Sequence, residues 1–290
     1  MRSEKEMFDL ILGIAESDNR IRAVYMNGSR TNPNVPEDIF QDYDIVYVVT
    51  ETKSFREDKT WIDRFGERLY MQYPEDNVCY PSDVENCYGW LIQFTDGNRL
   101  DLHVETISHM NNNILTDKLC VVLLDKDNIL PPIPKATDED YWVKKPNKRK
   151  FQCTCNEFWW CLNNVAKGLW RKEIPYVMDM INFNIRPMLI RLLEWKAGID
   201  TDFSVSVGKS GKYLYRWLSE DIWDRFLKTY SSSKIEDIWN SVFIMCELFD
   251  DMAKDLSIIF DYEYDTQEAN NSFQFLKDVK ILPEDADEIY

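Results

Sequence analysis

From residue 28 the chain reads Gly28-Ser29-Arg30-Thr31-Asn32-Pro33-Asn34-Val35-Pro36, and from residue 42 it reads Asp42-Tyr43-Asp44-Ile45-Val46-Tyr47-Val48-Val49. The second stretch is rich in β-branched residues and tyrosine, which predicts a strand. The prolines and asparagines of the first stretch predict a loop. Because side chains alternate along a strand, Asp42 and Asp44 are expected to point to the same face.

The residues around this stretch predict a mixed α/β region. Ser3 and Glu6 have the spacing of a helix capping box, and apolar residues recur behind them at helical spacing. Residues 21–27 form a short apolar run that predicts a strand ending at Gly28. Apolar spacing predicts a helix over residues 60–71, and residues 121–124 predict a further strand.

A hairpin is predicted later in the same region, where residues 91–95 and 99–104 flank the turn dipeptide Asp96-Gly97. In its second arm Arg99, Asp101 and His103 share one face. If this arm lies beside the strand of Asp42 and Asp44, three carboxylates converge. Hard oxygen ligands of this kind suit Mg²⁺, and two such ions about 4 Å apart can align an in-line displacement at phosphorus.

The second half of the chain has a different pattern. Residues 131–134, Pro-Pro-Ile-Pro, predict the start of a linker, and helical spacing dominates from about residue 145. Gly198 is expected to stop one helix, Ser219 to cap another, and residues 235–260 to form one long helix. We therefore predict an α+β fold. Residues 1–134 would form a domain with a mixed sheet and flanking helices, and residues 135–290 a helical bundle with an acidic tail after residue 260.

Composition narrows the classes of partner. The 290 residues include 51 Asp and Glu against 34 Lys and Arg, a formal charge of −17, which disfavours nucleic acid and attracts cations. No apolar run is long enough for a membrane span or a signal peptide, and the seven cysteines lack a disulfide or zinc spacing. We expect a cytoplasmic protein without membrane contact. A monomer is favoured, although no residue pattern determines the oligomeric state.

Each motif also has an ordinary structural interpretation when it stands alone. Asp-x-Asp before a strand is often a solvated turn, and a single Asp101 is often an exposed strand residue. His103 is more readily explained as a packed or solvent-facing histidine than as a catalytic group. The order Gly-Ser, loop, Asp-x-Asp on a strand and a third carboxylate on another strand, however, resembles the nucleotidyltransferase superfamily related to polymerase β.

Longer motifs are similar to those of the aminoglycoside 6-adenylyltransferases, which modify streptomycin-type drugs. The similarity runs to about residue 260 and is carried by residues 28–36 and 40–45, Asp125-Lys126-Asp127, Tyr141-Trp142-Val143-Lys144-Lys145-Pro146, Cys155-Asn156-Glu157-Phe158-Trp159, Lys167-Gly168-Leu169, Arg171-Lys172-Glu173, Trp195-Lys196-Ala197-Gly198-Ile199 and Ser206-Val207-Gly208-Lys209. One departure is the Leu102-His103 that follows Asp101, because the family pattern has a threonine near this position.

The resemblance implies an enzyme that transfers AMP from ATP to the 6-hydroxyl of a streptomycin-type aminoglycoside with Mg²⁺, which inactivates the antibiotic. It implies a polymerase β-like catalytic domain followed by a helical substrate-binding domain. Asp42, Asp44 and Asp101 would hold the metal, and Asp101 would act as base, metal ligand or both.

The remaining roles are also implied by the resemblance. Gly28, Ser29 and Arg30 would approach the phosphates of ATP. Lys209 and Lys212 would contact its β- and γ-phosphates. For the cationic drug, Glu157 and Asp179 are the candidate carboxylates, of which Glu157 opens an aromatic-rich helical stretch.

Three other functions stay open at this point. The same chemistry could act on another aminoglycoside or on a lincosamide. The fold could serve as a nucleotide-binding regulatory module without turnover, although all three carboxylates are present. A transferase that attaches AMP to a protein is the third alternative.

Overall fold

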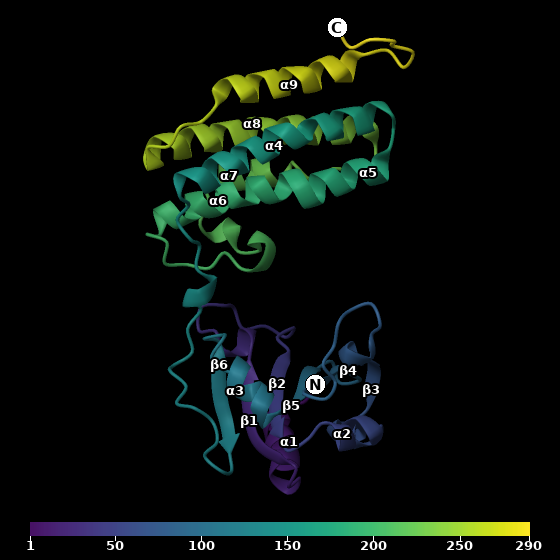
Figure 1. Ribbon diagram of the computed structural model, residues 1–290, viewed down its shortest axis with the longest axis vertical. Helices are drawn as coiled ribbons and strands as arrows, with labels where there is room; N and C mark the ends of the chain where they lie inside the picture. The colour runs from purple at the N-terminus through teal and green to yellow at the C-terminus, as the bar shows by residue number, and fades with distance from the viewer. The chain divides into compact units, whose positions relative to one another are not determined.

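The computed structural model describes residues 1–290, which form two compact units, Met1–Asp140 and Tyr141–Tyr290. Each unit has its own hydrophobic core, and the first combines a sheet with helices whereas the second is helical (Figure 1). The predicted α+β class, with a mixed sheet followed by a helical region, is confirmed.

The first unit contains all the strands of the chain. Its elements are α1 (Glu4–Ser17), β1 (Ile21–Asn27), β2 (Tyr43–Val49), α2 (Lys53–Glu57), β3 (Arg68–Gln72), β4 (Cys87–Phe94), β5 (Arg99–Thr106), α3 (Ile107–Asn113) and β6 (Cys120–Asp125). The predicted hairpin is confirmed as β4 and β5, and the predicted strand near residue 121 is confirmed as β6.

The six strands form one mixed sheet in the order β3-β4-β5-β2-β1-β6. The central pair, β2 and β5, is parallel, while all the other neighbours are antiparallel. A parallel pair requires the chain to leave β2, cross over and return on β5. The segment from α2 to β4 makes this crossover and adds the two outer strands β3 and β4 on its way.

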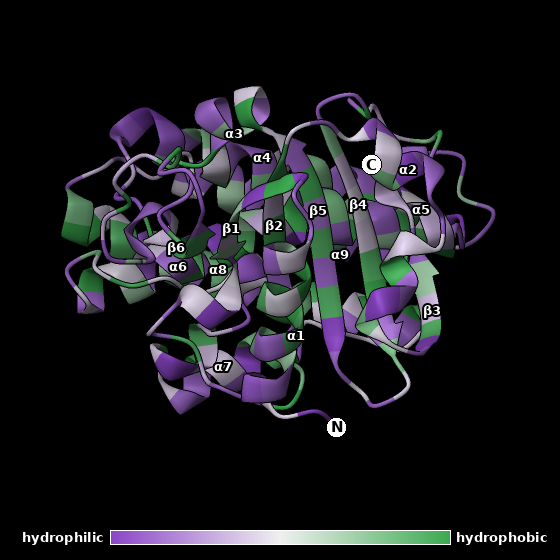
Figure 2. Ribbon diagram, turned by 90° about the horizontal axis from the view of Figure 1, so that it is seen from below, coloured by the Kyte–Doolittle hydropathy of each residue, from purple (hydrophilic) through white to green (hydrophobic).

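The two faces of the sheet are covered differently. Helix α1, which begins with the predicted capping box of Ser3 and Glu6, packs on a large core that includes Tyr47 of β2 and Leu102 of β5. Helix α3 covers part of the opposite face through Met110, next to Tyr25 and Val48. Figure 2 shows hydrophobic residues along the central strands and polar residues in the surrounding loops. The face under α3 is the one to which Asp44 and Asp101 belong, because they alternate with the α1-facing residues.

The helix predicted over residues 60–71 is wrong. Trp61–Phe65 forms a short 3-10 turn, which ends at Gly66 with a φ of 116°, and Arg68–Gln72 pairs with β4 as the edge strand β3. Trp61 and Phe65 are buried in the α1-side core, but Leu69 is 62% exposed. The apparent helical stripe therefore joined the apolar residues of a turn to an exposed residue of a strand.

The second unit is an assembly of helices around one core. Its elements are α4 (Lys148–Trp170), α5 (Ile174–Asp179), a π-helical segment (Met180–Ile185), α6 (Arg186–Asp200), α7 (Glu220–Leu227), α8 (Ile235–Phe260) and α9 (Thr266–Ile281). The long helix predicted over residues 235–260 and the cap at Ser219 are both confirmed. The acidic tail contains α9, a helix that the sequence pattern did not reveal. None of the helices combines the length with the apolar character that a membrane-spanning helix requires.

Gly198 does not stop its helix, contrary to the prediction. It lies inside α6, where a Cβ atom would sit 2.6 Å from the ring of Phe203. The chain turns away only at Asp202 and Phe203, whose φ angles of 52° and 55° are left-handed. Gly198 is thus explained by close packing, and the helix end is made by residues that carry side chains.

The centre of the helical core is a stack of aromatic rings. Phe158 of α4 is fully buried, and its ring lies parallel to that of Phe249 of α8 with 3.7 Å between ring centroids. Trp159 packs edge-on against both rings. This contact joins the two longest helices of the unit.

Replacing Phe158 with alanine should destabilise the second unit by about 3–5 kcal/mol, the cost of an unfilled aromatic cavity. Trp160 is the matched control, because it lies on the same helix but is 67% exposed. Trp160→Ala should change the stability by no more than about 0.5 kcal/mol. Urea unfolding of both variants measures the difference, and equal midpoints would contradict the assigned core.

Candidate active site

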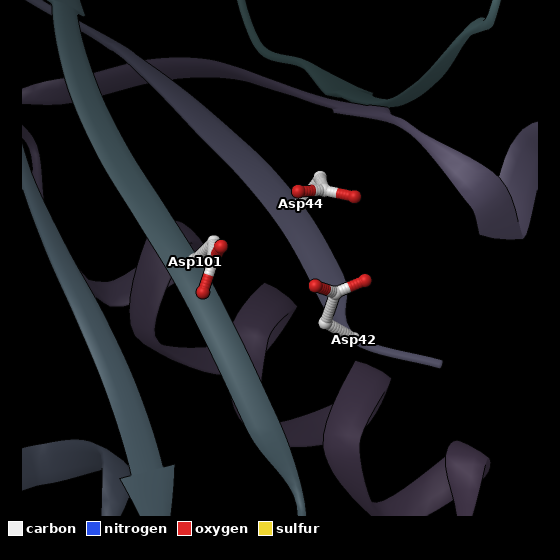
Figure 3. Close-up of side chains that lie close together, drawn as sticks. All are labelled: Asp42, Asp44 and Asp101. Carbon is white, nitrogen blue, oxygen red and sulfur yellow. The ribbon is translucent and has the colours of Figure 1, made fainter. Parts of the chain in front are cut away.

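Three carboxylates meet on the α3-side face of the sheet. Asp44 of β2 is directly opposite Asp101 of β5 in the parallel register, and Asp42 precedes β2 by one residue. Each carboxylate offers an oxygen, and these oxygens all lie within 4.8 Å of one another. Figure 3 shows the three groups between the two neighbouring strands. The convergence expected from the sequence therefore occurs.

Gly28 makes room for one of these carboxylates. It has a φ of 75°, and a Cβ atom at this position would lie 1.9 Å from Oδ2 of Asp44. The backbone of the Gly-Ser turn thus passes against the side chain of Asp44, where no larger residue fits. This is the close approach that a loop needs if its backbone is to meet a phosphate next to the carboxylates.

Ser29 begins the 3-10 turn Ser29–Thr31 directly after this glycine. The turn is closed by Thr31, whose amide and hydroxyl both donate to the carbonyl oxygen of Gly28, at 3.1 and 2.8 Å. Ser29 itself is only partly buried, and it directly follows the glycine that lies against Asp44.

Arg30 is held by the protein itself. Its Nε donates to the carbonyl oxygen of Asp42 at 2.9 Å and its Nη2 donates to that of Gln41 at 3.0 Å. The guanidinium also stacks on the ring of Tyr43 at 3.8 Å, and its Nη1 pairs with Glu4. Arg30 therefore ties the start of β2 to the Gly-Ser turn and sets the position of Asp42.

Burial and mutual repulsion shape the electrostatics of the cluster. Desolvation by burial, followed by the charges of Asp42 and Asp101, raises the pKa of the Asp44 carboxyl from 3.8 to about 7. A divalent cation at this point would relieve that repulsion, and three carboxylates supply the hard oxygen ligands that Mg²⁺ prefers. The residues present therefore fit the metal that the sequence predicted.

Sequence reasoning overlooked Arg99 as part of the site. Its guanidinium donates two hydrogen bonds to Asp101, from Nε to Oδ1 at 2.9 Å and from Nη2 to Oδ2 at 2.6 Å. Its Nε also lies 3.6 Å from Oδ2 of Asp42. The alternation of side chains along the strand could have identified Arg99, because Arg99 and Asp101 are two residues apart and share a face.

His103 continues the same face of β5. Its ring occupies the space above Gly89, where a Cβ would lie 2.4 Å from Cδ2, and its Nε2 lies 3.8 Å from Oε1 of Glu75. Glu75 is anchored by the amide of Gly89, which donates to Oε2 at 2.7 Å. The histidine is thus packed and partnered, which agrees with the ordinary structural interpretation of this residue.

The remaining candidate residues lie in the second unit on separate elements. Lys209 opens the turn Lys209–Gly211, and Lys212 follows it with its ammonium 5.0 Å from the ring of Tyr213. Glu157 is exposed on α4 and accepts a hydrogen bond from Cys161, while Asp179 is exposed at the end of α5. Their assignment to nucleotide or drug stays a prediction.

The raised pKa of Asp44 predicts a specific pH dependence of stability in metal-free protein. Between about pH 4 and 7 the folded chain keeps a proton that the unfolded chain has released, so stability falls as the pH rises. Asp44→Asn is neutral throughout and avoids this loss. In chelator at pH 8 it should be more stable than the wild type by on the order of 4 kcal/mol, because the pKa differs by about 3 units between the folded and unfolded chain.

This difference should shrink on acidification and vanish below the unfolded pKa of 3.8, where the unfolded chain is protonated at Asp44 as well, as thermal melts of both proteins across the range would measure. Using the difference between two proteins cancels the titration of the groups that do not interact with Asp44. A difference that does not change with pH would show that Asp44 is not the group responsible.

Comparison with known proteins agrees with this geometry. Residues 1–279 match the family described as streptomycin adenylyltransferase. An aminoglycoside 6-adenylyltransferase of Campylobacter jejuni is 42% identical over 91% of this chain and 91% of its own. Those of Bacillus subtilis and Staphylococcus aureus are 41% and 34% identical and cover 91% and 93% of this chain, and 93% and 96% of their own. The chain therefore belongs to the streptomycin adenylyltransferase family and is an enzyme of the adenylyltransferase type.

Proposed function

We propose that the chain transfers AMP from ATP to the 6-hydroxyl of a streptomycin-type aminoglycoside and thereby inactivates the antibiotic. The single observation that carries this proposal is the cluster of Asp42, Asp44 and Asp101 against the Gly28-Ser29 turn. The family match and the names of the three relatives support the choice of acceptor.

The reaction is a displacement at the α-phosphorus of ATP. The drug hydroxyl oxygen forms a new bond to this phosphorus, the bond to the oxygen that bridges to the β-phosphorus breaks, and pyrophosphate leaves. Asp101 is proposed to accept the proton of the hydroxyl, to hold the metal, or both. When bound, Mg²⁺, which we propose as two ions, would offset charge on the phosphate oxygens and hold the attacking and leaving oxygens in line.

The Gly-Ser turn is proposed to receive the phosphates. Gly28 brings the backbone close to Asp44, and Ser29, the next residue, is proposed to supply hydroxyl and amide donors. Arg30, predicted to touch the phosphates, is proposed to act mainly by positioning Asp42, since its contacts go to backbone carbonyls. Lys209 and Lys212 are proposed to contribute positive charge to the β- and γ-phosphates.

The acceptor is a cation, and the chain carries a formal charge of −17 that attracts cations over long range. Glu157 and Asp179 are proposed to pair with the guanidinium and amine groups of the drug. Both side chains belong to exposed residues, so their carboxylates are accessible. We propose that the enzyme acts in the cytoplasm, where ATP is available and where its free thiols stay reduced.

The direct test is incubation of the purified enzyme with ATP and Mg²⁺ and, in separate reactions, with streptomycin, other aminoglycosides and a lincosamide. Mass spectrometry should detect the gain of one AMP on streptomycin and none in the presence of a chelator. A product on the lincosamide alone, or no product on any aminoglycoside, would contradict the proposed acceptor.

The same assay tests the third carboxylate. Asp101→Asn should lower turnover at least about 10²-fold, the low end for loss of a general base. The control is Asp127→Asn, which removes the same charge from the carboxylate partner of Arg22, just beyond the end of β6, and should leave turnover unchanged. Near-normal turnover of Asp101→Asn would remove Asp101 from the reaction.

A further inference from the structure

The carboxylate cluster already has a positive partner within the chain. Arg99 is the first residue of β5 and approaches Asp101 side-on, so that both carboxylate oxygens of Asp101 accept a hydrogen bond from it. The same guanidinium lies 3.6 Å from Asp42. Arg99 therefore sits against two of the three carboxylates that the proposed metal would need.

A guanidinium and a divalent cation cannot share these oxygens without cost. At separations of a few ångströms the two positive charges repel by on the order of 1 kcal/mol or more, even at the dielectric constant of water. The bidentate pair also occupies one lone pair on each oxygen of Asp101, which leaves fewer positions for a metal ion. Metal binding to Asp101 is therefore expected to compete with Arg99.

The side chain of Arg99 can move away from the carboxylates, whereas that of Arg30, the other nearby arginine, is held in place. The side chain of Arg99 is 48% exposed, and its hydrogen bonds and ion pairs are with Asp101 and Asp42 alone. The side chain of Arg30 is only 14% exposed and is tied to the carbonyl oxygens of Gln41 and Asp42. Movement of Arg99 toward solvent breaks no other hydrogen bond or ion pair.

We propose that Arg99 is an exchangeable counter-ion of the metal centre. In metal-free protein it neutralises Asp101 and Asp42 and so limits the repulsion within the cluster. When the divalent metal binds, it displaces the guanidinium from Asp101. Arg99 is thus a positioning residue that sets the affinity of the site for metal, a property that goes beyond the proposed transfer reaction and rests on its metal centre.

The test is Mn²⁺ binding without nucleotide, with free Mn²⁺ measured by electron paramagnetic resonance at constant ionic strength. Arg99→Met should bind Mn²⁺ at least about fivefold more tightly than the wild type, because no ion pair has to be broken. Arg99→Lys keeps the charge but loses the two-point grip, so its affinity should lie between these two. A gain in affinity is a result that general structural damage would not produce.

Arg22→Met is the matched control. Arg22 of β1 forms a bidentate pair with Asp127, which lies two residues beyond the end of β6, and the loss of Arg22 changes the net charge by the same amount. Its Mn²⁺ affinity should equal that of the wild type. An equal gain in Arg22→Met would reduce the effect to net charge and overturn the proposal.

Weaker or unchanged Mn²⁺ binding by Arg99→Met would also overturn it, since Arg99 would then support the bound state or have no influence. Should Arg99→Met fail to fold, Arg99→Lys decides by the same criterion, with tighter binding than the wild type expected. If the wild type binds no Mn²⁺, with or without ATP, the proposed metal centre itself is contradicted, and not only the role of Arg99.

Discussion

The parallel pairing of β2 with β5 is the constraint on which the site depends. It places Asp44 opposite Asp101, and the alternation of each strand turns both side chains to the face opposite α1. A shift of the register by one residue would send one of the carboxylates into the hydrophobic core. The apolar residues that alternate with the carboxylates therefore fix the register that brings Asp44 and Asp101 together. The packing of Leu100, Leu102 and Val104 thus determines where the chemistry can occur.

Gathering like charges on a partly buried face is unfavourable, and the surrounding residues offset this cost in three ways. The slot left by Gly28 allows Asp44 to sit against the backbone of the Gly-Ser turn. Arg30 holds the chain before β2 without neutralising the carboxylates directly, since it binds carbonyl oxygens. Arg99 supplies the one positive charge in hydrogen-bonding contact with the cluster. The proposed exchange of Arg99 for metal would allow the same site to be stable when empty and receptive when magnesium and nucleotide arrive.

The sequence predicted those parts of the structure that depend on local pattern. Alternation placed Asp42 with Asp44 and Asp101 with its neighbours, and apolar spacing found the long helix α8. It could not show that β5 returns beside β2, because strand pairing across a long crossover is a tertiary property. Only the resemblance to known enzymes suggested this pairing.

The prediction of a helix over residues 60–71 was wrong because the spacing of apolar residues does not show which of them are buried. A buried turn and an exposed edge strand together have apolar residues at helical spacing. Gly198 was misjudged because contact with Phe203, and not the end of a helix, requires its small size. The sequence placed Arg99 on the same face as Asp101, but the two hydrogen bonds between them depend on side-chain positions that no sequence pattern encodes.

The central claim is that the three carboxylates form a metal centre for a nucleotide. Anomalous diffraction from crystals grown with Mn²⁺ and a non-hydrolysable ATP analogue tests it most directly. A metal centre at this site predicts an anomalous peak about 2 Å from oxygens of Asp42, Asp44 and Asp101, with the triphosphate beside Ser29. Ordered nucleotide with no peak at the cluster, or with metal bound only elsewhere, would contradict the claim.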